Sequence, residues 1–501
     1  MSAIVDKFTG LYRKESRDVG YGMVDLLLGK YRANKVQHGS NLNPFWVSNP
    51  FFAAPANGYD LIVGQERIIY GDALVNLPVP VPEDITVTYT CDIGTQTGNN
   101  LVITPTISNI GDHALSILVE KGTKVIGTFT TNLKVTDLEP KAALKVLLVG
   151  DSTVENGIDE ITTAINTSLT GTTITYVGKQ TSPLGIKHEG HGGYTWWIFA
   201  GTAPSPFRKA GAINVAAYFT DNAISIPDIV SFRLGINDMF GQLDKGYSEA
   251  ELNAAIDLIV GLAKNLVDGF IADTTSKIII ELPGICRNSV EGWNGAYDES
   301  IYNQNMYVEF IHRYWGAMIT QFDAYNARVT VNATPIFLDR LAGYPEIQGV
   351  HFSSAGNAQI GAGLACKINK LIDSLYGVEL VANNRFASDT IWAKNAGLTI
   401  ANNKCAFNVA YTYSSMLDQT ISLTNGKTYR TKYEIADYVS GTLRIEIGTS
   451  ADYNNGALLS GNGVKVEIIP LTKANPNKVQ FRDWNVAPVL SLKQVSVCEV
   501  L

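Results

Sequence analysis

The stretch that most constrains this chain is Lys145–Asn156, KVLLVGDSTVEN. Its residues Val146–Val149 form an apolar run with no polar residue between them, as in strands buried on both faces of a parallel sheet. Gly150 ends the run, and the next residues would begin a helix. This pattern predicts that Ser152 lies at the carboxyl end of a buried strand, where open α/β sheets bind their ligands.

A Gly-Asp-Ser tripeptide also has a structural interpretation, in which Asp and Ser simply cap a helix. Three later stretches favour catalysis: residues 188–197 read HEGHGGYTWW, 230–238 read VSFRLGIND, and 350–357 read VHFSSAGN. In this order the blocks resemble those of the SGNH, or GDSL, hydrolase family. The resemblance covers residues 142–378, about half of the chain.

By this resemblance the four marker residues of the family are Ser152, Gly193, Asn237 and His351. A serine hydroxyl needs a base within hydrogen-bond reach, so the resemblance implies that His351 activates Ser152. It also implies that the Ser152 N–H, the Gly193 N–H and the Asn237 side-chain amide bind the oxyanion. The structural alternatives are a strand-end turn for the Asn237 block and a flexible loop for the Gly193 block.

One residue departs from the family pattern. The family carries an Asp three residues before the His, where this chain has Gln348. Glutamine can accept a hydrogen bond from the imidazole Nδ1–H, but it has no charge to stabilise imidazolium. Three alternatives remain: a Ser–His dyad oriented by Gln348 or a backbone carbonyl, a carboxylate supplied by Glu346, or a scaffold with weakened catalysis whose main role is binding. We favour the dyad.

Three further residues of these blocks, Asp151, His191 and Asp238, are expected to contact substrate, and His188 is expected to line the pocket beside His191. The glycine-rich stretches match neither a P-loop nor a GxGxxG motif between a strand and a helix. We therefore expect no metal and no cofactor.

The predicted fold class is multidomain, because 501 residues exceed what one core supports. Residues 142–378 alternate strands and helices, which predicts a central α/β/α, flavodoxin-like parallel sheet. Residues 61–138 alternate like an antiparallel β-sandwich. Residues 380–501 resemble a C-terminal, carbohydrate-binding-like jelly-roll module, and residues 1–60 are expected to be an irregular anchoring segment.

Within these regions the sequence predicts individual elements. Strands are expected at 145–149, 174–178, 228–234, 277–282 and 328–332, and helices at 249–268, 303–324 and 355–376. In the C-terminal module six aromatic residues are candidates for stacking on sugars, with burial in the core as the alternative: Trp392, Tyr411, Tyr413, Tyr429, Tyr433 and Trp484.

Composition limits the partners. The net charge of −8 argues against nucleic acid. The five cysteines lie far apart without a CxxC pair, as isolated buried thiols would. No apolar run is long enough to span a membrane, and the N-terminus lacks the pattern of a signal peptide.

The leading functional hypothesis is a serine esterase that removes O-acetyl groups from cell-surface or capsular polysaccharide. The resemblance of the flanking β-modules suggests a phage tail fibre or spike, a virion protein acting at the host surface, usually as a homotrimer in contact with other tail proteins. One alternative is an exported bacterial carbohydrate esterase, secreted by another route. The other is a non-catalytic glycan receptor-binding protein on an SGNH scaffold.

Overall fold

The computed structural model describes residues 54–77, 79–139, 141, 143–201, 205–243, 249–297, 302–373, 375–376, 379–408, 415–449, 452–472, 477–483 and 486–500. The chain divides into two compact units, residues 1–370 and 371–501. It is multidomain and rich in β structure, as expected. Most of the expected anchoring segment 1–60 lies outside the described residues.

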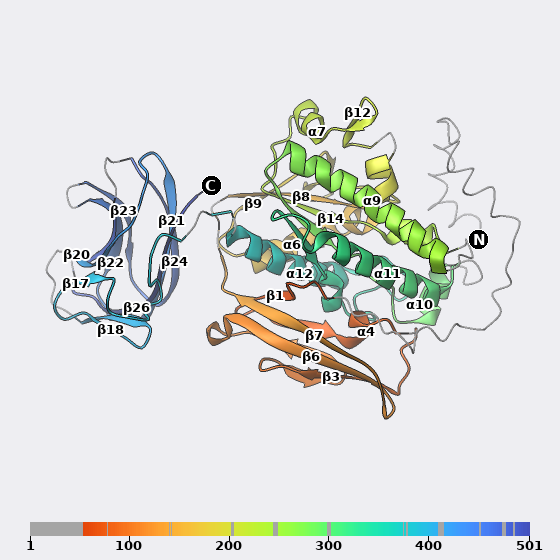
Figure 1. Cartoon of the computed structure of the whole chain (residues 1–501), viewed down its shortest axis with the longest axis horizontal. Helices are drawn as coiled ribbons and strands as arrows, with labels where there is room; N and C mark the ends of the chain where they lie inside the picture. Colours follow the sequence, from red (N-terminus) through yellow and green to blue (C-terminus); the bar gives the residue numbers. More distant parts are fainter. Residues whose placement is uncertain are drawn as a thin grey trace, which may run out of the picture. The chain divides into compact units, whose positions relative to one another are not determined.

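A largely parallel sheet lies in the first unit (Figure 1). On one side of β8 (Leu144–Gly150) follow, in order, β14 (Ile229–Arg233), β15 (Lys277–Glu281) and β16 (Val329–Asn332), all parallel. On its other side β8 pairs in parallel with β9 (Ile174–Val177) and β11 (Lys187–Gly190), and β10 (Gln180–Thr181) runs antiparallel to β11. The register brings the last residues of five strands to one edge: Gly190, Gly150, Arg233, Glu281 and Asn332.

The predicted strands match this sheet to within one or two residues, but β11 was not predicted. It is four residues long and reads KHEG, with two charged residues and no apolar run. Nothing in this stretch has the alternation or the β-branched content that identifies strands. Its pairing with β8 depends on contacts between residues 40 positions apart in the sequence.

Helices cover both faces of the sheet. The four long helices are α6 (Ile158–Ser168), α9 (Glu249–Asp273), α11 (Gln304–Phe322) and α12 (Ser354–Asp373). Helices α9 and α11 lie side by side (Figure 1) and share one core with Leu147, Phe232 and Ile280 of the sheet. Alternate residues such as Val146 and Ile279 are equally buried, so the opposite face is covered too. Helix α6 was not predicted.

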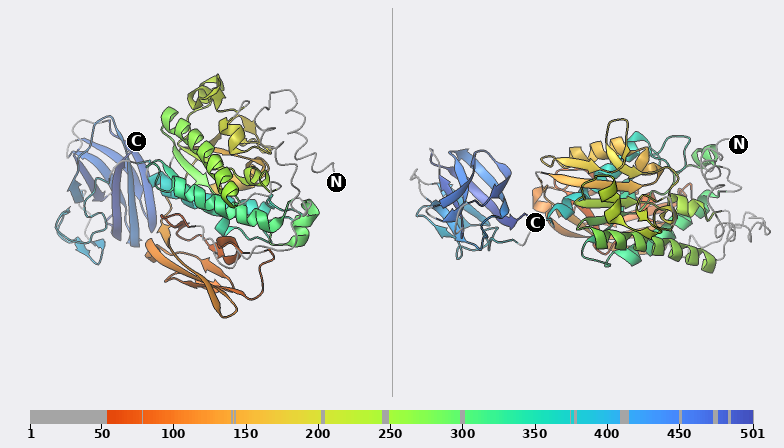
Figure 2. Two further views of the ribbon diagram at one scale, coloured as in Figure 1. Left: turned by 45° about the vertical axis from the view of Figure 1, so that its right-hand side comes forward. Right: turned by 90° about the horizontal axis from the view of Figure 1, so that it is seen from above.

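The N-terminal β region belongs to the same unit (orange in Figures 1 and 2). One sheet has the order β1 (Tyr59–Ile62), β7 (Lys124–Thr136), β6 (Gly111–Lys121) and β3 (Ile85–Thr90), and the other has the order β2 (Arg67–Tyr70), β5 (Asn100–Ile103) and β4 (Thr95–Thr97). All pairs are antiparallel except β1 with β7. Its core is continuous with that of the central sheet, and a buried ion pair joins Asp60 to Lys367 of α12.

Shorter elements complete this unit: α4 (Gly71–Leu74), η1 (Ile107–Asn109), α5 (Ser152–Glu155), the π-helical turn η2 (Trp197–Gly201), β12 (Arg208–Lys209), β13 (Ala212–Ile213), α7 (Val215–Asp221), α8 (Ile236–Phe240), α10 (Val290–Ala296) and η3 (Thr334–Phe337). Among the described helices, none has the length and hydrophobicity that a membrane span requires. The five cysteines are free thiols; four are buried and Cys91 is partly exposed.

The second unit is a sandwich of two five-stranded antiparallel sheets around its own core. One sheet has the order β17 (Ala393–Lys394), β20 (Ser415–Thr420), β25 (Lys478–Asp483), β22 (Leu443–Thr449) and β23 (Asp452–Leu459). The other has the order β18 (Thr399–Ala401), β19 (Lys404–Asn408), β26 (Val489–Glu499), β21 (Thr428–Ser440) and β24 (Gly463–Pro470).

The aromatic residues proposed as sugar platforms do not serve that role where they are described. Trp392, Tyr429 and Tyr433 are all buried in the core of the sandwich. Tyr411, Tyr413 and Trp484 lie outside the described residues. The core interpretation is therefore correct for the first three.

Candidate active site

Ser152 begins α5 directly after β8. Gly150 has to be a glycine here, because an added Cβ would lie 2.3 Å from the Val154 side chain and 2.7 Å from the Arg233 carbonyl oxygen. Asp151 caps α5, accepting from the Thr153 N–H at 2.9 Å. As the first residue of α5, Ser152 has an N–H that no intrahelical acceptor can reach.

The structure brings Ser152 and His351 together across 199 residues of sequence. The Ser152 Oγ lies 2.9 Å from His351 Nε2. Only 9% of Ser152 is exposed. His351 lies on the loop just before α12, at the same edge of the sheet as the end of β8.

Gln348 contacts the second ring nitrogen of this histidine, Nδ1. When the Ser152 hydroxyl donates to Nε2, neutral imidazole carries its proton on Nδ1, which can donate to the Gln348 Oε1 at 3.3 Å. Burial lowers the pKa of His351, so the ring stays neutral at neutral pH. Glu346, the alternative orienter, is exposed to solvent.

Gly193 lies in a tight turn beside the serine. The Tyr194 N–H donates to the His191 carbonyl at 3.1 Å, and Gly193, the third residue of this turn, has φ +79°. A positive φ at that position is the type II arrangement, which favours glycine. A Cβ added to Gly192 would lie 4.0 Å from the Ser152 Cβ, so the turn lies next to the serine.

Asn237 and Asp238 tie α8 to the stretch that follows this turn. The Asn237 Nδ2 donates to the Tyr194 carbonyl at 3.0 Å, which leaves its second N–H for another acceptor. The Asp238 Oδ2 accepts from the Trp196 N–H at 3.2 Å. Burial, with the nearby Asp151 carboxyl, raises the pKa of Asp238 to about 7.

Two of the three residues expected to contact substrate are located inside the protein. Asp151 is completely buried and Asp238 is 5% exposed, and both bind backbone N–H groups of their own chain. These carboxyl groups hold turns in place, a role that the sequence pattern did not distinguish from substrate contact. Burial raises the pKa of Asp151 to about 6.

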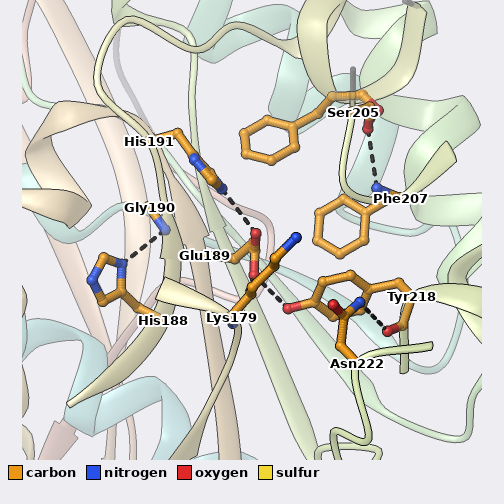
Figure 3. A network of polar contacts seen from close by, with 10 residues as sticks. Lys179, His188, Glu189, Gly190, His191, Ser205, Phe207, Tyr218 and Asn222 are labelled. Carbon is orange, nitrogen blue, oxygen red and sulfur yellow. Dashed lines mark hydrogen bonds and ion pairs between the residues drawn. The ribbon is translucent and has the colours of Figure 1, made fainter. Parts of the chain in front are cut away.

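The third residue, His191, belongs to a polar network centred on Glu189, which the sequence analysis missed (Figure 3). Glu189 is completely buried, and its carboxylate lies 2.8 Å from His191 Nε2 and accepts from the Lys179 N–H at 3.0 Å. The Tyr218 hydroxyl also donates to it. Because β11 itself has no local strand signal, nothing in the sequence marked Glu189 as a buried residue.

His188 points to the other side of β11 from Glu189. Its Nδ1 accepts from the Gly190 N–H at 3.0 Å, and the residue is buried (Figure 3). Burial lowers its pKa. Within the described parts of the chain, no group of three His, Cys, Asp or Glu side chains is placed to hold a metal ion.

No protein-family model matches the chain, and no curated protein matches it. Among solved structures it is similar to the CBM22-1 xylan-binding domain of Xyn10C from Paenibacillus barcinonensis, with 8% identity, 25% of this chain and 96% of that chain covered, and a TM-score of 0.21. It is also similar to a CBM4 structure, with 14% identity, 24% and 99% covered, and a TM-score of 0.20. Both are carbohydrate-binding modules.

Proposed function

We propose that this chain is a serine esterase of the SGNH type. The observation that carries the proposal is the 2.9 Å contact between Ser152 Oγ and His351 Nε2. A partly buried, neutral histidine in contact with a serine at the end of a parallel strand is the arrangement that nucleophilic acyl transfer needs. The turn that contains Gly193 lies beside the same serine, and the Asn237 amide is bound to the Tyr194 carbonyl at the end of that turn, so both are available as further N–H donors.

The reaction proceeds in two steps. His351 Nε2 takes the Ser152 proton while Oγ attacks the ester carbonyl, and the tetrahedral oxyanion is stabilised by the Ser152 and Gly193 N–H groups and the Asn237 amide. The intermediate collapses as His351 returns the proton to the leaving alcohol. A water molecule, deprotonated by His351, then releases the acid from the acyl-enzyme. Gln348 holds the ring through Nδ1 in both steps.

The substrate we propose is an O-acetylated polysaccharide of a cell surface or capsule. Its support is the family resemblance together with a second unit built as a β-sandwich. We also propose, as a separate point, that the second unit binds glycan. The setting, a homotrimeric phage tail fibre or spike attached to other tail proteins, rests on the resemblance, and co-purification with tail particles tests it against an exported bacterial esterase.

Acetate release from O-acetylated polysaccharide, with wild type beside Ser152→Ala, tests the function. We expect release by the wild type and a loss of at least about 1,000-fold in the variant, because removal of the nucleophile leaves only residual rate enhancement. Release that continues unchanged in Ser152→Ala would exclude Ser152 as the nucleophile.

Glycan binding without catalysis is the second candidate, and Gln348 is the observation that favours it. A neutral amide at 3.3 Å orients the imidazole but does not stabilise imidazolium electrostatically. If the wild type hydrolyses no acetylated glycan and no model ester, yet binds the polysaccharide in a sedimentation assay, this second function is the correct one.

A further inference from the structure

Glu189 is a buried charge that the proposed mechanism does not use. Burying a carboxylate is costly unless donors compensate it, and here donors come from three separate segments. They are the His191 ring, the Tyr218 hydroxyl of α7 and the Lys179 backbone N–H between β9 and β10 (Figure 3). The Glu189 carboxylate is therefore held in one position, and it can fix the position of a side chain that binds it.

The side chain that it holds is His191. The imidazole is bound at Nε2 by Glu189, and its face stacks on Tyr194, with ring centroids 4.5 Å apart and planes at 15°. Its backbone N–H donates to the Gly150 carbonyl at 2.9 Å, two residues before Ser152. His191 is thus fixed at its ring and at its backbone.

His191 and Tyr194 are the two ends of the turn that contains Gly193. The N–H of Gly193 belongs to the central peptide of this turn, whose direction depends on both ends. The Tyr194 carbonyl also accepts from Asn237 Nδ2, so two proposed oxyanion donors are connected to one turn. A shift of His191 would move both.

We propose that Glu189 is a positioning residue: through His191 it fixes the His191–Tyr194 turn, and with it the Gly193 N–H, where the oxyanion forms. This inference rests on the proposed esterase function and deepens it. Glu189 touches neither substrate nor the reacting atoms. Its contribution is made in the transition state, so it affects kcat more than KM.

The test is Glu189→Gln, which keeps the size of the side chain and removes its charge. Hydrolysis of p-nitrophenyl acetate is measured per active site, with sites counted by fluorophosphonate labelling of Ser152. We expect kcat to fall about 10- to 100-fold, below the 10²–10³-fold that follows complete loss of an oxyanion donor, with KM within about threefold. Affinity for a boronic acid that forms a tetrahedral adduct should fall by the same factor as kcat.

Asp60→Asn is the matched control. It also replaces a buried carboxylate of the first unit by an amide, at a position paired with Lys367 of α12, but it leaves the contact between Glu189 and His191, so kcat should stay within about threefold of wild type. If the two variants have the same melting temperature and lose kcat by the same factor, the loss follows stability and not the contact between Glu189 and His191. That result would overturn the proposal. So would a Glu189→Gln enzyme with wild-type kcat per site.

His191→Phe tests whether Glu189 acts through His191. Phenylalanine keeps a ring to stack on Tyr194 but cannot bind Glu189. If Glu189 acts through His191, adding Glu189→Gln to His191→Phe lowers kcat by less than about threefold; multiplicative losses would overturn the proposal. A wild-type enzyme without Ser152-dependent activity would instead refute the proposed function, and this inference with it.

Discussion

Gln348 determines how His351 behaves at the level of single residues. An Asp at this position would place a negative charge beside the ring and favour imidazolium, whereas the amide offers only a hydrogen bond acceptor at 3.3 Å. Burial then lowers the pKa of His351. The general base therefore stays neutral to a lower pH than an exposed histidine would.

The first prediction concerns Gln348→Asp. Catalysis needs neutral His351, so activity falls as the pH drops through the pKa of this group, which in the wild type lies below the usual value of about 6.5. The added carboxylate raises that pKa, so the acid limb of kcat/KM should move to higher pH while the plateau changes by less than about tenfold. Glu346→Gln, at an exposed position, is the control and should leave the profile unchanged. Complete inactivity of Gln348→Asp would mean that Gln348 has another role, such as holding substrate.

The second prediction concerns Asp238→Asn. Burial raises the pKa of the folded carboxyl to about 7, above about 3.9 in the unfolded chain, so the folded state holds an extra proton between these values. The wild type therefore loses stability as pH rises through this window, by about 1.4 kcal/mol per unit of pKa difference. Asparagine does not titrate and can still accept from the Trp196 N–H.

Urea denaturation at pH 4.5 and pH 7.5 measures this effect. The free energy of unfolding of Asp238→Asn, relative to wild type, should be larger at the higher pH by about 2–4 kcal/mol. Equal differences at the two pH values would contradict a raised pKa for Asp238.

Strand β11 and helix α5 are the elements whose contact builds the site. Gly190 of β11 pairs with Gly150 of β8. A Cβ added to Gly190 would lie 2.6 Å from the Glu155 backbone nitrogen. This close approach of two backbones is possible because the side chain is absent. It places the turn that follows β11 beside Ser152.

The third prediction is that Gly190→Ala destabilises the protein and Gly261→Ala does not. At Gly190 the new methyl group must push β11 away from α5, which should cost about 1–3 kcal/mol of stability and lower esterase activity. At Gly261, inside α9, an added Cβ meets nothing within 4 Å, and alanine should stabilise the helix by about 0.5–1 kcal/mol. Thermal unfolding measures the stability of both variants. A Gly190→Ala protein as stable as wild type would show that β11 can move away from α5 without a loss of stability.

On the scale of the whole molecule, each of the two units has its own hydrophobic core. All residues of the candidate site lie in the first unit. The second unit contributes none of them. Separate cores also allow the units to unfold independently.

The fourth prediction uses Phe481, which is fully buried in the second unit and packs edge-on against Tyr433 with ring centroids 5.7 Å apart. Phe481→Ala should destabilise that unit by about 3–5 kcal/mol and lower one calorimetric transition while the other stays in place. Hydrolysis of a small ester below both transitions should not change. Leu458→Ala, at a position 48% exposed, is the control. A shift of both transitions by Phe481→Ala would mean that the units unfold together.

The sequence by itself determined the regular part of this protein. The apolar run before Gly150 and the strand–helix alternation after it predicted five strands of the central sheet, because burial and periodicity are local properties of a chain. The four ordered blocks also singled out Ser152 and His351, which the fold places 2.9 Å apart. Their catalytic roles stay a prediction.

Only the tertiary structure decided which polar residues face inward. Asp238 and Glu189 have the same side-chain chemistry as a substrate-binding carboxylate, but they accept from Trp196 and Tyr218, which lie 42 and 29 residues away in sequence. Strand β11 lacks a local signal and exists through its pairing with β8. Such contacts arise when distant segments pack together, and no local pattern records them.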